Sequence, residues 1–105
     1  MKVRIKEKSW VAGFAAAKLK AKKVAIVFGR TIYLHNTSKQ EFLEDREWVC
    51  HELKHVEQYK ENGFLGFIMK YLFESIKHGY YNNKYEVEAR ESEKDIELLN
   101  RMQII

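Results

Sequence analysis

The sequence of 105 residues contains no proline, five glycines and a single cysteine. Because proline and glycine disfavour helices most strongly, their scarcity favours long helical segments. The lone Cys50 excludes an internal disulfide framework and a cysteine-based zinc cluster, and it suits a reducing compartment, so we expect a cytoplasmic protein. No stretch approaches the roughly 18 consecutive apolar residues that a membrane-spanning helix requires.

Positive charge is unevenly distributed along the chain, whose formal net charge is +4. Residues 1–23 are strongly basic, and the remainder is net acidic. Such a segment could contact nucleic acid, an anionic membrane or an acidic protein. A solvated helix face is the more ordinary explanation, so nucleic acid is not an expected partner. The basic residues, opposed only by Glu7, are Lys2, Arg4, Lys6, Lys8, Lys18, Lys20, Lys22 and Lys23.

Hydrophobic residues make up 46% of the sequence, which predicts one packed domain over residues 1–105. The apolar segment 10–17 superficially resembles the core of a secretion signal. It is short, lacks leucine and runs directly into several lysines, so an amphipathic helix explains it better and secretion is not expected.

The first third of the chain alternates between strand and helix patterns. Residues 2–6 predict a short edge strand, and Ser9 can cap a helix over residues 10–21. The β-favouring runs 24–28 and 31–35 flank Gly29-Arg30, which predicts a hairpin.

A long helix is predicted from Thr37-Ser38 to a stop at Gly63, because Ser38 and Glu41 have capping-box spacing. An apolar helix over 64–77, a loop over 80–83 and a final helix over 84–103 follow. Asn82 or Asn83 is expected to cap the final helix. The predicted class is α+β, mostly helical, with a small antiparallel sheet or hairpin packed on the helix of residues 38–62.

The most informative segment, His51-Glu52-Leu53-Lys54-His55, lies in the middle of that helix. Side chains four residues apart share a helix face, so the two imidazoles can bind one tetrahedral Zn²⁺. Glu52, between them, is placed to act as a base toward a bound water. This pattern predicts hydrolysis by an activated water.

Two histidines hold zinc poorly, so a third protein ligand is expected elsewhere. The extended form HExxHxxGxxH is absent, since Gln58 replaces the glycine and Glu61 the third histidine. Glu86 is favoured because it opens the final helix and Ala89, one turn later, permits close helix packing, whereas Glu88 projects about 200° away. The candidates are His35, His78, Glu74, Glu86, Glu88 and Glu93.

The segments HELKHVEQ and YEVEAR together resemble the zincin metallopeptidases of the gluzincin branch, whose short forms are called minigluzincins. The resemblance implies that His51, His55 and Glu86 bind zinc and that Glu52 is the general base. It also implies a zincin-like fold and a peptide or protein substrate. In that family an aspartate usually follows ExxA and orients a ligand histidine, but this chain has Arg90 there. Glu93 or Asp95 are candidates to replace it.

A hydrolase of this kind also needs a donor to the developing oxyanion. Tyr80, Tyr81 and His78 precede Glu86, and we rank Tyr81 first. A peptide substrate would extend along an exposed edge strand.

Two alternatives remain open. The zinc could staple a non-catalytic protein-interaction module, as the small size of the chain suggests. Alternatively, no metal binds and the chain is a basic interaction domain.

Overall fold

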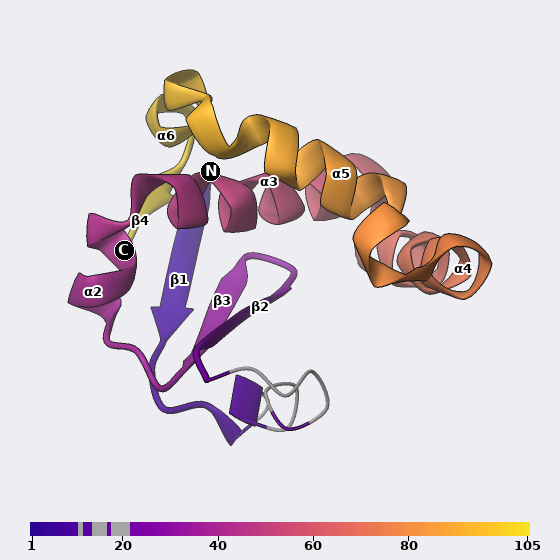
Figure 1. The fold of residues 1–105 in the computed structure, drawn as a ribbon. Coiled ribbons are helices and arrows are strands. Elements are labelled where there is room, and N and C mark those ends of the chain that lie inside the picture. Colours follow the sequence, from indigo (N-terminus) through magenta and orange to yellow (C-terminus); the bar gives the residue numbers. More distant parts are fainter. Residues whose placement is uncertain (11, 14–16, 18–21) are drawn as a thin grey trace.

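The protein's computed structural model describes residues 1–10, 12, 13, 17 and 22–105. Small strands precede a series of helices, which confirms the α+β class (Figure 1). In chain order the elements are β1 Lys2–Lys6, β2 Val24–Phe28, β3 Thr31–His35, α2 Lys39–Glu44, α3 Arg46–Asn62, α4 Phe64–Asn82, α5 Lys84–Glu91, the short 3₁₀ helix η1 Ser92–Lys94, α6 Ile96–Arg101 and β4 Gln103–Ile104.

The described strands form one mixed sheet in the order β2-β3-β1-β4. The predicted hairpin is confirmed: β2 and β3 pair antiparallel from Val24↔His35 to Phe28↔Thr31, and Gly29 supplies the positive φ of 64° in the turn. β1 runs parallel to both β3 and β4. The expectation of a purely antiparallel sheet was therefore wrong.

The strand of residues 2–6 is confirmed, but its predicted position at the edge was wrong. β1 lies inside the sheet, and its Val3 is fully buried. Its second neighbour, β4, falls where the final helix was expected to continue. Alternation of apolar and charged residues reports one buried face, and this pattern is the same for inner and edge strands.

The predicted long helix is in fact two helices separated at Asp45. The capping box of Ser38 and Glu41 is present and starts α2. Asp45 leaves helical geometry, and its carboxylate accepts from Trp48 N at 3.1 Å, which starts α3. The predicted end at Gly63 is confirmed, with a φ of 79° there.

Helix α3 is the centre of the molecule. It contacts β2, α2, α4, α5, η1 and α6, and Figure 1 shows it between the sheet and α5. Leu53 and Val56 of α3 join Ile32 and Leu34 of the sheet in the main core. Three polar side chains of α3 are also buried, which is costly unless each finds a partner. They are Glu52, His55 and Gln58.

The regular part of α4 ends close to its predicted end, because Gly79 has non-helical geometry with a φ of 81°. Beyond this kink, a further turn continues to Asn82. The predicted loop at 80–83 is thus mostly the last turn of α4. Asn83 caps α5 as expected, and its oxygen accepts from Tyr85 N at 2.9 Å. Its amide also donates to Tyr71 O and Ser75 Oγ, so the start of α5 is anchored on α4.

The final helix was predicted to run unbroken over 84–103, and this was wrong. α5 ends at Glu91, and Asp95 has extended geometry before α6. At the other end of the chain, Ala12 N bonds to Ser9 Oγ and residues 10, 12, 13 and 17 are helical. The remainder of the predicted 10–21 helix lies outside the described residues. Within the described part of the chain, no helix combines the length and apolar character needed to traverse a membrane.

Candidate metal centre

His51 and His55 lie one turn apart on α3, and their ring centroids are 5.2 Å apart. Together with Glu52 they form a group whose potential ligand atoms all lie within 4.8 Å of one another. His55 and Glu52 are buried, and His51 is partly exposed. These three residues could hold a metal ion.

Glu86, in the first turn of α5, reaches both imidazoles. Its Oε1 lies 3.1 Å from His51 Nε2 and 3.2 Å from His55 Nε2. In a tetrahedral zinc site with bonds of about 2.0–2.1 Å, neighbouring donor atoms are about 3.3 Å apart. The spacing of these atoms therefore fits a shared ion. The Tyr71 hydroxyl donates a hydrogen bond to the other carboxylate oxygen of Glu86, Oε2, and thereby orients the carboxylate.

The remaining candidate ligands do not meet the Nε2 atoms. Glu93 and Glu88 contact other atoms around the site, and Glu74 accepts from Lys84 N at 3.2 Å. His35 packs closely against Gly13: a Cβ atom on that glycine would lie 3.2 Å from His35 Nδ1. His78 is exposed. Of the six candidates, the structure brings Glu86 to the two histidines.

In both histidines the second ring nitrogen, Nδ1, has a side-chain hydrogen-bond partner. His51 Nδ1 lies 2.9 Å from Glu93 Oε2, and His55 Nδ1 lies 2.8 Å from Gln58 Oε1. Glu93 thus occupies the role expected of the missing aspartate, which the sequence had left open between Glu93 and Asp95. Gln58 was missed, because it had been noted only for replacing a glycine. Its position three residues after His55 was the available signal.

Arg90 itself turns away from the site. Its guanidinium donates to Tyr81 O and lies 4.0 Å from the centroid of the Tyr81 ring. Arg90, at the position where gluzincins usually have an aspartate, therefore contacts the end of α4.

The charges of the site depend on one another. Burial alone would lower the pKa of His51, but the hydrogen bond with Glu86 and the charge of Glu52 outweigh it and raise that pKa to about 9. Burial would also lower the pKa of His55, but the hydrogen bond with Glu86 and the charge of Glu52 raise it above its ordinary value. Burial raises the pKa of Glu52 to about 7. Glu86 is also buried, but its hydrogen bonds with both histidines hold its pKa far below the ordinary value.

A cleft of about 430 Å³ opens beside these residues. One wall is β2, an edge strand of the described sheet, and the opposite wall is α4. Glu52, His55 and Glu86 contribute the polar end of an otherwise mainly apolar lining. The other lining residues are Val24, Ala25, Ile26, Val27, Phe28, Tyr59, Phe67, Ile68, Tyr71, Leu72 and Tyr80.

Residues 2–63 match the family model of the eCIS core domain, where eCIS denotes an extracellular contractile injection system. The match covers more than half of the chain. The chain belongs to the eCIS core domain family. Searches of curated proteins and of solved structures found no match.

In this eCIS core domain the matched segment ends with α3. It includes His51, Glu52 and His55, whereas Glu86 and Glu93 lie beyond it. The segment that follows the match therefore supplies Glu86, which contacts both histidines, and Glu93, the partner of His51 Nδ1.

The two tyrosines before α5 differ in position. Tyr80 is 52% exposed and lines the cleft, whereas Tyr81 is 69% exposed and is not among the described residues that line it. Of the two, the structure therefore brings Tyr80 to the cleft, and the role expected of Tyr81 stays a prediction. Burial and the charges of Glu86 and Glu52 raise the pKa of Tyr80 to about 12, so its hydroxyl keeps its proton at neutral pH.

Proposed function

We propose that this protein is a zinc-dependent metallopeptidase that hydrolyses peptide bonds. His51, His55 and Glu86 would be the zinc ligands and Glu52 the general base. The observation that carries the proposal is the position of Glu86 Oε1, 3.1 and 3.2 Å from the two Nε2 atoms, at the end of a cleft. The resemblance of the segments HELKHVEQ and YEVEAR to those of gluzincins supports the same assignment.

Zinc bound there would supply the Lewis acidity that activates water and polarises a carbonyl group. Glu52 lines the cleft beside the ligands, where it would accept a proton from the attacking water and return it to the leaving amine. Glu93 and Gln58 would hold the two imidazoles with Nε2 toward the ion.

Tyr80 is the proposed donor to the developing oxyanion, in place of Tyr81. It lines the cleft together with Glu52 and Glu86, and its phenol is protonated at neutral pH. A hydroxyl near the reacting carbonyl stabilises the negative charge that forms on oxygen.

The proposed substrate is an extended polypeptide. β2 pairs on one side with β3, and its other side faces no strand of the described sheet. A peptide can add to such an edge through backbone hydrogen bonds. The apolar side chains of β2 and α4 would then receive apolar substrate side chains.

Metal analysis tests the proposal directly. The purified protein should contain zinc near one equivalent per chain, Glu86→Ala should lose it, and Glu52→Gln should keep it but lose cleavage of a quenched fluorescent peptide library. A metal-free wild-type protein that cannot be loaded with zinc would overturn the proposal.

A second candidate function is a zinc-stapled interaction module without catalysis. It is favoured by the contacts of Glu86, which join α5 to α3 and thereby tie the C-terminal helices to the matched family segment. Full zinc occupancy and a strong loss of thermal stability in chelator, with no cleavage of any library peptide, would select it.

A further inference from the structure

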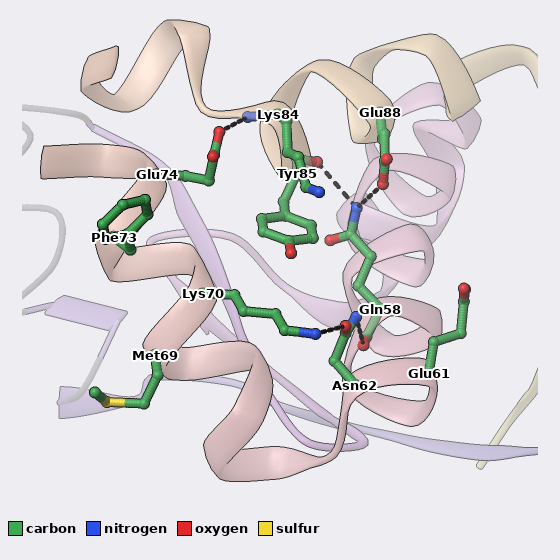
Figure 2. A pocket seen from close by; sticks show the side chains of 10 residues that line it. All are labelled: Gln58, Glu61, Asn62, Met69, Lys70, Phe73, Glu74, Lys84, Tyr85 and Glu88. Atoms are coloured by element: carbon green, nitrogen blue, oxygen red, sulfur yellow. Dashed lines mark hydrogen bonds between the residues drawn. The ribbon is translucent and has the colours of Figure 1, made fainter. Parts of the chain in front are cut away.

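Gln58 is almost completely buried, at 2% exposure, yet each of its polar atoms has a partner. Its Oε1 lies 2.8 Å from His55 Nδ1. Its Nε2 donates to Tyr85 O at 3.1 Å and to Glu88 Oε1 at 3.0 Å, as Figure 2 shows. Figure 2 shows the hollow of about 570 Å³ that Gln58, Tyr85 and Glu88 help to line. The lining of this hollow does not include His51, Glu52, His55 or Glu86.

These partners determine the orientation of the amide. Tyr85 O and the Glu88 carboxylate only accept hydrogen bonds, so the amide nitrogen must face α5. The amide oxygen then faces His55, and because it only accepts, Nδ1 of His55 must carry a proton. In the neutral ring, the lone pair is therefore on Nε2, the atom that faces Glu86.

The same amide links two ligands. Tyr85 immediately precedes Glu86, so the bond from Gln58 to Tyr85 O holds the backbone of α5 at the residue next to the carboxylate. The bond to His55 holds the imidazole on α3. One side chain thus sets the position of Glu86 and the tautomer of His55 together.

We propose that Gln58 is a positioning residue of the metal centre, acting through His55 and through the start of α5. This proposal rests on the proposed zinc site. Glu88, which was considered as a ligand, would serve instead to fix the Gln58 amide. Loss of such an outer partner commonly weakens metal binding 10–100-fold.

Three variants test this role. Gln58→Met keeps the length of the side chain but removes both the acceptor for His55 and the donor for α5. Glu88→Gln is the matched control, since its amide oxygen can still accept from Gln58. Gln58→Glu combined with Glu88→Gln restores an acceptor facing His55 and a donor facing residue 58.

The main measurement is the zinc dissociation constant at pH 7, by competition with a chromophoric chelator. We expect a 10–100-fold weaker constant for Gln58→Met and less than a threefold change for Glu88→Gln. The double variant should lie between them, because it restores the acceptor for His55 but not the donor to Tyr85 O. Long-range ¹H–¹⁵N spectra of the zinc-loaded protein should also show a protonated Nδ1 on His55, with a sharp signal lost in Gln58→Met.

Zinc binding by Gln58→Met within threefold of wild type, with an unchanged His55 signal, would overturn the role of Gln58 alone. If Gln58→Met does not fold, the double variant decides. A folded, zinc-loaded double variant without a sharp Nδ1 proton signal from His55 contradicts the role, because residue 58 still offers an acceptor to that atom. Failure of the wild-type protein to bind zinc would instead overturn the proposed function.

Discussion

Glu93 Oε2 lies 2.9 Å from His51 Nδ1, so a carboxylate from the 3₁₀ helix after α5 supports a histidine of α3. Asp or Glu in this position raises the basicity of the imidazole and fixes its orientation. In the proposed zinc site, Glu93 would give His51 the support that an aspartate three residues earlier, at the position of Arg90, usually gives in gluzincins.

Substitution of Glu93 tests this relationship. Glu93→Ala should weaken zinc binding about 10–100-fold, because His51 loses the acceptor that orients it. The measurement is a competition titration. Glu91→Ala, a neighbouring exposed carboxylate, is the control and should bind zinc like wild type. Equal effects of the two substitutions would contradict the assignment of Glu93.

Glu52→Gln should separate metal binding from catalysis. We expect full zinc content and a fall in peptide hydrolysis of about 10²–10⁴-fold, because the amide cannot accept the proton of the attacking water. Turnover of a quenched fluorescent peptide gives the rate. Glu61→Gln, at an exposed position of the same helix, should leave the rate unchanged. Retained activity in Glu52→Gln would rule out the proposed base.

Tyr80→Phe should lower kcat about 10²-fold or more with little change in KM, because only the developing oxyanion needs the hydroxyl. Tyr81→Phe is the matched control next in sequence, and it should behave like wild type because Tyr81 is exposed and contacts Arg90. Steady-state kinetics on one peptide substrate distinguish them. The opposite ranking would return the role to Tyr81.

Removal of zinc should destabilise the fold. A ligand that binds only the native state, present at about 100 times its dissociation constant, stabilises by about 2.7 kcal/mol, which corresponds to roughly 10–20 °C in Tm for a domain of this size. Thermal unfolding with and without chelator measures the shift. Glu86→Ala should unfold at one temperature under both conditions, and a chelator effect of wild-type size in this variant would place the metal elsewhere.

Local signals in the sequence predicted most of the elements. The Ser38–Glu41 capping box, Gly63 and Asn83 each act within a few residues, so the pattern alone shows them. The break at Asp45 was not predicted, because in the sequence an acidic residue inside a charged helix looks the same as one that caps the next helix.

Features set by tertiary packing could not be predicted in this way. β4 is only two residues long and exists because it pairs with β1. Gln58 gains its partners when α5 packs on α3. Tyr80 and Tyr81 follow the kink at Gly79, so the sequence pattern of the preceding helix could not predict which of them lines the cleft.

The side of β2 that pairs with no described strand has a consequence for the behaviour of concentrated samples. Its sequence VAIVF carries neither charge nor proline, so it lacks the features that commonly keep such an edge from pairing with a neighbouring molecule. A second molecule offering an extended segment would then compete with substrate for the same backbone groups. Specific activity should consequently fall as protein concentration rises.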